Sequence, residues 1–271
     1  MSKYWAKRQA KTQEALTAKS VAETEAQISK YYLQSMKRVI DAFEATYNKL
    51  LVSLGSDRAP TPADLYNLDK YWELQSQLRD ELTRLGNKQA AVLSKKFERQ
   101  YGEIYNSINL TIGKKSAKAF NKLDKQVVNQ AINEIWCADG KPWSQRVWTN
   151  TEKLQETLNK HLITCITTGK KPSELKKILE RDFGVAYNRA DTLVRTEMAH
   201  IQTQAAKQRY EDYGLRYYEF LGNDDDTCGN HSVDCHELDG ERFLFSEMTI
   251  GVNAPPIHPN CKCCIIPVVE E

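Results

Sequence analysis

The apolar spacing near the start of the chain limits the fold more than any other feature. From residue 28 to residue 54 the apolar positions follow one another in steps of mostly three or four residues, which places them on one stripe of an α-helix. These positions are Ile28, Tyr31, Tyr32, Met36, Val39, Ile40, Phe43, Tyr47, Leu50, Leu51 and Leu54. We therefore predict a helix from Tyr4 to Leu54. Such a wide stripe indicates packing against other helices, because an isolated helix gains little stability in water.

The sequence keeps this helical character to about residue 213. Helix-forming Ala, Leu, Lys, Glu and Gln dominate, and glycines follow several of the apolar stripes. We predict further helices over residues 62–86, with Thr61 as N-cap, and over 88–110, 116–136, 147–167, 173–184 and 187–213. These helices are expected to pack antiparallel or in an elongated bundle.

The pattern changes at Leu215. Short, partly alternating segments rich in aromatic and β-branched residues are typical of strands. We predict strands at residues 216–221, 241–245 and 264–269. The expected fold is mainly α, with an elongated multi-helix N-terminal part and a small α+β, zinc-knot-like C-terminal module.

Composition narrows the class of protein. The chain has 271 residues and 41% apolar content, enough for one large domain or two modest ones. It contains no apolar run of membrane-spanning length, and its N-terminus lacks the apolar stretch of a signal peptide. We expect a protein made and kept in a reducing cytoplasm, where cysteines are thiols or metal ligands.

Charge divides the chain in two. The net charge of +2 combines a balance of about +12 up to residue 210 with about −10 from Glu211 onward. Such asymmetry indicates different partners for the two parts, or two solvated faces of opposite sign.

Cysteine and histidine gather near the C-terminus in two groups. The first contains Cys228, His231, Cys235 and His236, and the second contains His258, Cys261, Cys263 and Cys264. Two ligand pairs on two turns are the usual arrangement of a structural zinc site, with four ligands in tetrahedral geometry. Cys228 can pair with His231 or Cys235, and Cys261 with His258 or Cys263.

A metal would also supply stability that this segment lacks, since it has few large apolar side chains. The alternative is a set of buried thiols that pack as small hydrophobes. We expect this second behaviour of Cys137 and Cys165, which stand alone on helical faces.

Three other clusters have plainer explanations. Asp224 to Asp226 is expected to form an acidic turn rather than a cation site. Arg195, Thr196 and Glu197 are expected to form a polar helix surface or a buried ion pair. Tyr4 and Trp5 are candidates for exposed aromatic anchors or for local core packing.

The order of motifs in the last 80 residues resembles the phage head morphogenesis family, the Mu F-like minor head proteins. The motifs are Arg-Thr-Glu at 195–197, Asp-Thr-Cys at 226–228, Cys-His-Glu-Leu-Asp-Gly at 235–240, and Pro-Pro-Ile-His-Pro-Asn-Cys-Lys-Cys at 255–263. The N-terminal Tyr4-Trp5-Ala6-Lys7-Arg8 is also similar to the start of some members. Two departures are the six residues that lie between Cys228 and Cys235, and Lys262 in place of arginine.

The resemblance implies zinc ligands at Cys228, Cys235, His258 and Cys261. Cys263 is the first substitute, and His231 competes because the first loop is widened. It also implies a helical portal- or capsid-interaction region at 1–185 and a Mu F-like domain with the Cys/His cluster at 186–271.

The function implied is a minor structural protein of a tailed bacteriophage, not an enzyme, that associates with the portal protein and acts in head assembly and DNA delivery. Further candidate partners are the major capsid or scaffolding protein and phage DNA; no membrane and no small-molecule substrate are expected. The expected location is the virion, in the head interior or at the portal vertex, after assembly in the host cytoplasm. Some relatives carry a toxin domain after the knot, and we expect none here.

Two alternatives stay open. The first is a metal-dependent nuclease or hydrolase that uses the C-terminal Cys/His/Asp cluster, with Glu237 and Asp239 as candidate bases by proximity alone. The second is a DNA-binding protein, although its lysines are spread over all the helices rather than gathered in one stripe.

Overall fold

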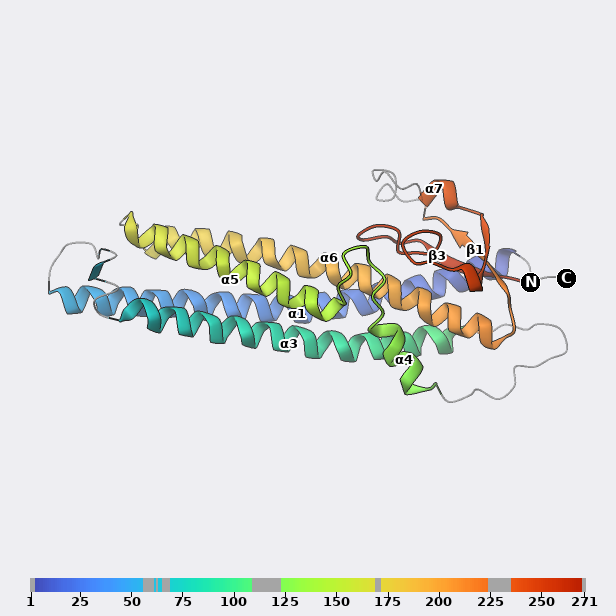
Figure 1. Cartoon of the computed structure of the whole chain (residues 1–271), viewed down its shortest axis with the longest axis horizontal. Coiled ribbons are helices and arrows are strands. Elements are labelled where there is room, and N and C mark those ends of the chain that lie inside the picture. Colours follow the sequence, from blue (N-terminus) through green and yellow to red (C-terminus); the bar gives the residue numbers. More distant parts are fainter. Residues whose placement is uncertain are drawn as a thin grey trace. The chain divides into compact units, whose positions relative to one another are not determined.

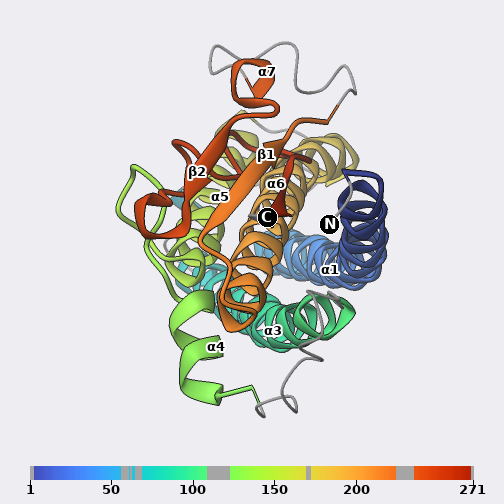
Figure 2. The same cartoon turned by 90° about the vertical axis from the view of Figure 1, so that its right-hand side faces the viewer.

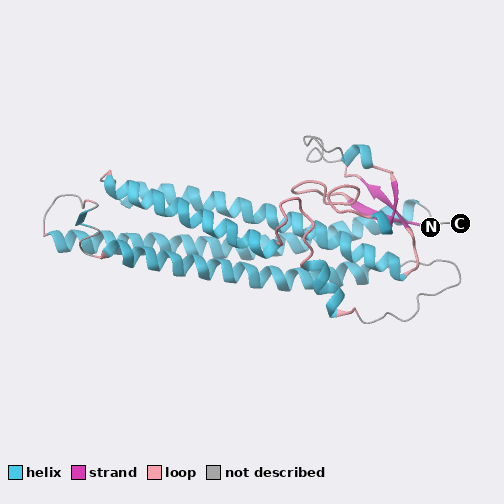
Figure 3. Ribbon diagram, viewed as in Figure 1, coloured by secondary structure: helices cyan, strands magenta, loops and turns pink. Residues whose placement is uncertain are grey.

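The structure is a computed structural model of the whole chain, and it describes residues 3–55, 61, 63–64, 69–108, 123–168, 172–223 and 235–269. Helices account for most of these residues, and the strands belong to the C-terminal segment (Figures 1 and 3). The elements are α1 (Lys3–Leu54), α3 (Lys70–Ser107), α4 (Lys125–Ile132), α5 (Trp143–Thr167), α6 (Pro172–Asp212), β1 (Tyr217–Leu221), α7 (Cys235–Leu238), β2 (Arg242–Leu244), η1 (Phe245–Glu247) and β3 (Cys264–Val268). The predicted fold class is confirmed.

The chain divides into two compact units, and three long helices each contribute to both. Unit 1 contains residues 1–25, 92–143 and 192–271, and unit 2 contains residues 26–91 and 144–191. The domain division predicted at residue 185 falls inside α6 and stays a prediction.

Unit 2 is built from four helical segments, one each from α1, α3, α5 and α6. Their apolar stripes are buried at helical spacing, as the sequence predicts for α1. A buried polar network joins all four segments. The amide of Asn150 donates to the hydroxyl of Tyr32 (3.0 Å) and to the carbonyl of Ala186 (2.9 Å), and Tyr32 donates to Gln89 (3.3 Å). These bonds fix the register of the segments because the partners are buried.

In unit 1, three helical segments pack together through polar pairs inside an apolar interface. Thr17 of α1 donates to Gln202 of α6 and accepts from Gln100 of α3, each at 2.6 Å. Gln13 donates to the hydroxyl of Tyr210 at 3.2 Å. Each pair satisfies polar groups that would be costly to bury alone.

A three-stranded antiparallel sheet completes unit 1, in the order β2-β1-β3. Figure 2 shows β1 and β2 side by side. On one face, Leu221, Cys264 and Ile266 pack against Ala6 and Ala10 of α1. Side chains alternate along a strand, so the neighbours of these residues face the other way.

On the other face of the sheet, Phe220 packs with three buried cysteines, Cys235, Cys261 and Cys263. The rings of Tyr218 and Phe245 lie 5.2 Å apart, and Tyr210 of α6 lies 6.2 Å from Phe245. The aromatic residues that predict the first two strands therefore also attach the sheet to the end of α6.

The predicted helix break at Gly86 is wrong, because α3 continues through it. A Cβ at this position would lie 2.6 Å from Cζ3 of Trp148. The glycine therefore permits close approach of α5 rather than ending a helix. At the predicted start, residues 63–64 are helical and Thr61 Oγ1 accepts the backbone N–H of Asp64 at 3.4 Å, as expected of an N-cap. The helix differs further on, because Asp69 has φ 54° and α3 begins after it.

The predicted break at Gly184 is also wrong. Helix α6 is continuous because its buried stripe passes across this position, through Leu179, Phe183, Ala186 and Ala190. The cost of one helical glycine, about 1 kcal/mol, is small beside the burial of these side chains. The helix predicted at 116–136 is shorter at its end, since α4 stops at Ile132.

Candidate metal centre

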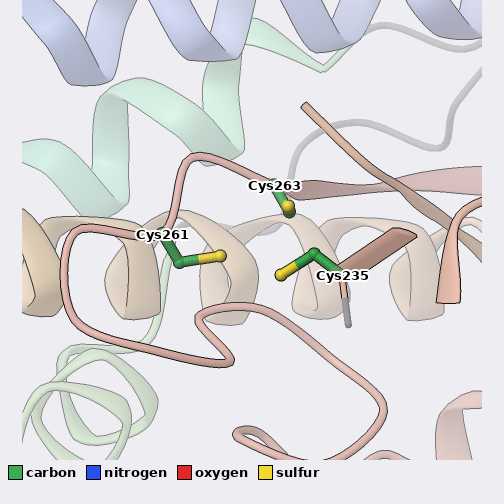
Figure 4. A group of neighbouring side chains, drawn as sticks. All are labelled: Cys235, Cys261 and Cys263. Atoms are coloured by element: carbon green, nitrogen blue, oxygen red, sulfur yellow. The ribbon is translucent and has the colours of Figure 1, made fainter. Parts of the chain in front are cut away.

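Three cysteine side chains converge within unit 1. The sulfur atoms of Cys235, Cys261 and Cys263 all lie within 4.8 Å of one another. Figure 4 shows the three side chains pointing toward a common centre. All three are buried, at no more than 4% exposure, and they pack with Phe220, Leu238, Phe243 and Ile257.

Cys235 is placed by the turn that follows it. It opens α7, and the Leu-Asp-Gly motif after it closes back onto β1. The carboxylate of Asp239 accepts a hydrogen bond from the backbone N–H of Gly222 at 2.7 Å, and Gly240 N–H donates to Phe220 O at 2.9 Å. Gly240 has φ 84°, which glycine adopts readily. The motif thus holds Cys235 beside the end of β1.

Cys261 is placed by a tight turn at His-Pro-Asn-Cys. Its N–H donates to His258 O at 3.1 Å, and Asn260 has φ 62°, a conformation that asparagine tolerates better than most residues. Nδ1 of His258 lies 2.9 Å from Pro259 O, and because a carbonyl only accepts, Nδ1 carries the proton. The Pro255–Pro256 peptide bond before this turn is cis.

The turn is also tied to α6. The backbone N–H of Asn260 donates to the hydroxyl oxygen of Thr196 at 3.1 Å, and this hydroxyl donates to Thr192 O at 2.7 Å. Thr196 is thus a positioning residue for the cysteine turn. The sequence placed it in a polar helix surface or a buried ion pair, and this role was missed; the available signal was its position in the Arg-Thr-Glu motif.

The electrostatics of the cluster centre on Cys261. The thiols of Cys235 and Cys263 both donate hydrogen bonds to its sulfur, and this lowers the pKa of Cys261. The same interaction raises the pKa of Cys263, and burial adds to that effect. Three thiols gathered in this way suit a metal site, where each sulfur loses its proton to solvent and binds the ion as a thiolate.

Two of the four predicted ligands, Cys235 and Cys261, lie in this group, and Cys263 is its third member. His258 is buried but is not one of the three groups brought together. Cys228 and the competing His231 lie outside the described residues. Cys228 as a ligand and the choice of fourth ligand stay predictions.

Three thiolates suit zinc, which is held in structural sites by four cysteines or by three cysteines and a histidine. Among the described residues, this is the one group of three or more Cys, His, Asp or Glu side chains whose ligand atoms are this close. The neighbouring thiol Cys264 faces α1 instead, and burial raises its pKa to about 12. Adjacent cysteines therefore differ in role: Cys264, the first residue of β3, faces α1, whereas Cys263, just before the strand, faces Cys235 and Cys261.

The rest of the Arg-Thr-Glu motif forms a buried cluster and an ion pair that is not buried, since the Arg195 side chain is 41% exposed. Arg195 pairs with Glu25 at 2.5 Å. Glu197 accepts from Trp136 Nε1 at 3.2 Å, and His200, fully buried, stacks on the Trp136 ring at 5.1 Å. These contacts hold the segment after α4 on α6.

Comparison with known proteins identifies the region that carries the site. No curated protein and no solved structure matches the chain. None of the helices in the described part of the chain has the length and apolarity needed to cross a membrane. The family model described as Phage Mu protein F like protein matches residues 156–266, which include all three converging cysteines and Thr196. Residues 156–266 are therefore a domain of the Phage Mu protein F-like family.

Proposed function

We propose that this chain is a minor structural protein that acts in head morphogenesis of a tailed bacteriophage, in association with the portal. The observation that carries the proposal is the family match over residues 156–266. The sequence motifs at 195–197, 235–240 and 255–263 lie in or beside the cysteine group: Thr196 accepts a hydrogen bond from Asn260, and Asp239 accepts one from Gly222.

The helices supply long surfaces for protein contact in this proposal. Unit 2 is held by a buried network among four helical segments, and this gives a rigid body rather than a mobile tail. The major capsid or scaffolding protein and the packaged DNA are further candidate partners, and the virion is the proposed location.

Co-expression with the portal protein of the same phage tests this function. We expect the chain to co-sediment with portal rings and to be found in purified heads in few copies. A chain that sediments apart from the rings and is missing from purified heads would contradict the proposal. A matched control is an unrelated helical protein of similar size, expressed with the same portal.

We further propose that the cysteine group binds zinc as a structural ion. Cys235, Cys261 and Cys263 would hold it, with Cys228 or His258 as the candidate fourth ligand. The bound ion would cross-link α7 to the turn before β3, beside Leu238 and Ile257, which pack against the same cluster. A donor set rich in thiolates is typical of structural rather than catalytic zinc sites, and Asp239 is engaged by Gly222.

Metal analysis of the purified full chain tests the zinc proposal independently of the head role. We expect about one zinc per chain, as in other single tetrahedral sites. Protein purified without chelator that contains no zinc, and that binds none when zinc is added, would overturn the site while leaving the family function untouched.

A further inference from the structure

The first turns of α1 are anchored to the sheet by one face only. Ala6 and Ala10 are buried against Cys264 and Ile266 of β3, and Gln13, one helical turn further, reaches Tyr210. The short side chains bring the helix close to the strand. Residues 6–13 are thus a fixed part of unit 1.

The opposite face carries two exposed aromatic rings. Tyr4 is 66% exposed and Trp5 is 53% exposed. Their rings lie 5.4 Å apart at 78°, and the guanidinium of Arg8 lies 5.3 Å from the Trp5 ring centroid. Two exposed aromatic rings in contact form a continuous surface of the kind that partners bind.

Basic side chains surround these rings. Lys7, Arg8 and Lys11 are exposed, and at 100° per residue they fall on the same side of the helix as Tyr4. No acidic residue occurs in the sequence before Glu14. We name Tyr4, Trp5, Lys7, Arg8 and Lys11 together the N-terminal patch. It offers positive charge and flat ring surface but no large aliphatic side chain.

We propose that the N-terminal patch binds single-stranded nucleic acid, with the cations on phosphates and the two rings against bases. A single-stranded nucleic acid repeats a phosphate and a base along its length. Basic side chains placed between exposed aromatic rings can bind both groups. A helix that lies on a membrane needs an apolar face for the lipid, and here that face is covered by β3. An acidic protein segment would match the charge but would leave the rings without stacking partners.

The test measures binding of fluorescent dT20 to the full chain by anisotropy at several salt concentrations. We expect K7A/R8A/K11A to weaken binding about tenfold at 100 mM salt. Its salt slope should fall by about 2, since each phosphate contact on a single strand contributes about 0.7. Y4A/W5A should weaken binding at least fivefold with an unchanged slope, because stacking does not release counterions.

Matched controls separate the patch from general positive charge. K160A/K176A/K177A removes three exposed lysines elsewhere, and Y71A/W72A removes another edge-to-face Tyr–Trp pair, with ring centroids 5.2 Å apart. We expect each to change affinity less than twofold. Equal losses in the patch and control variants would overturn the proposal. So would no binding to dT20, equal displacement of dT20 by polyglutamate, or binding only to anionic phosphatidylglycerol vesicles.

Discussion

The hydroxyl of Thr196, in the middle of α6, accepts the backbone N–H of Asn260 at 3.1 Å. This bond joins the helix to the turn that presents Cys261. It links two motifs that are 64 residues apart in sequence. The geometry of the cysteine group therefore depends on Thr196, which is not itself a candidate metal ligand.

Thr196→Val removes the acceptor while keeping the branched shape of the side chain. We expect it to lower the free energy of unfolding by about 1 to 3 kcal/mol, because the N–H of Asn260 loses its partner at a partly buried site. Urea denaturation measures the change. Thr196→Ser is the matched control, since it keeps the hydroxyl; a loss in Ser as large as in Val would show that the hydrogen bond is not the cause.

Cys263→Ala and Cys264→Ala compare adjacent buried thiols that belong to different clusters, one with Cys235 and Cys261 and the other against α1. We expect Cys263→Ala to lose most of the bound zinc, measured by elemental analysis. Its free energy of unfolding should fall by the amount that zinc binding contributes, ~2.7 kcal/mol when free zinc is 100 times the Kd. Cys264→Ala should keep the zinc and lose about 1 kcal/mol of packing. Equal zinc content in both variants would contradict this assignment.

Gly86→Ala and Gly184→Ala test two glycines inside long helices. Alanine is the better helix former by about 1 kcal/mol. At Gly184 a Cβ would meet nothing within 4 Å, so we expect Gly184→Ala to stabilise the protein by up to that amount. At Gly86 the ring of Trp148 blocks the new methyl, and we expect a loss of about 1 to 3 kcal/mol. Thermal unfolding measures both, and shifts of the same sign would contradict the prediction.

The carboxylate of Glu134 gives stability a dependence on acid pH. It accepts from Nε2 of His200 at 3.0 Å and from Gln204, and these contacts lower the pKa of Glu134 from its usual 4.5. The folded state therefore favours the ionised carboxylate. The contribution of Glu134 to the free energy of unfolding is fully present above pH 4.5. It is lost as the pH falls through the lowered pKa of this carboxylate.

Glu134→Gln should therefore be less stable than the parent at pH 7, with a gap that narrows below pH 4.5. Because the side chain of Glu134 is 45% exposed, solvent screening limits the gap at neutral pH to about 1 kcal/mol. Urea midpoints at pH 7 and pH 4 measure it. Glu152→Gln, an exposed glutamate of α5, is the control for loss of one carboxylate. A gap that widens in acid would refute the assigned contact.

The sequence by itself determined the local structure of most of the chain. Apolar steps of three and four predicted α1 to within one residue at its start, and short aromatic or branched segments predicted β1, β2 and β3. These signals are readable because side-chain periodicity follows directly from helix and strand geometry. The clustered cysteines also predicted where a metal site would be, and Cys235 and Cys261 do converge.

Tertiary packing decided what periodicity leaves open. A glycine after a row of apolar residues predicts the end of a helix. Gly86 instead leaves room for the ring of Trp148, which is far away in the sequence. Spacing alone could not choose among eight candidate ligands, because the distance between two sulfurs depends on how two separate turns dock. That docking depends on the Asp239 to Gly222 and Thr196 to Asn260 hydrogen bonds. Cys264, the first residue of β3, faces α1, whereas Cys263, which precedes the strand, lies with Cys235 and Cys261. This separation depends on the pairing of β3 with β1.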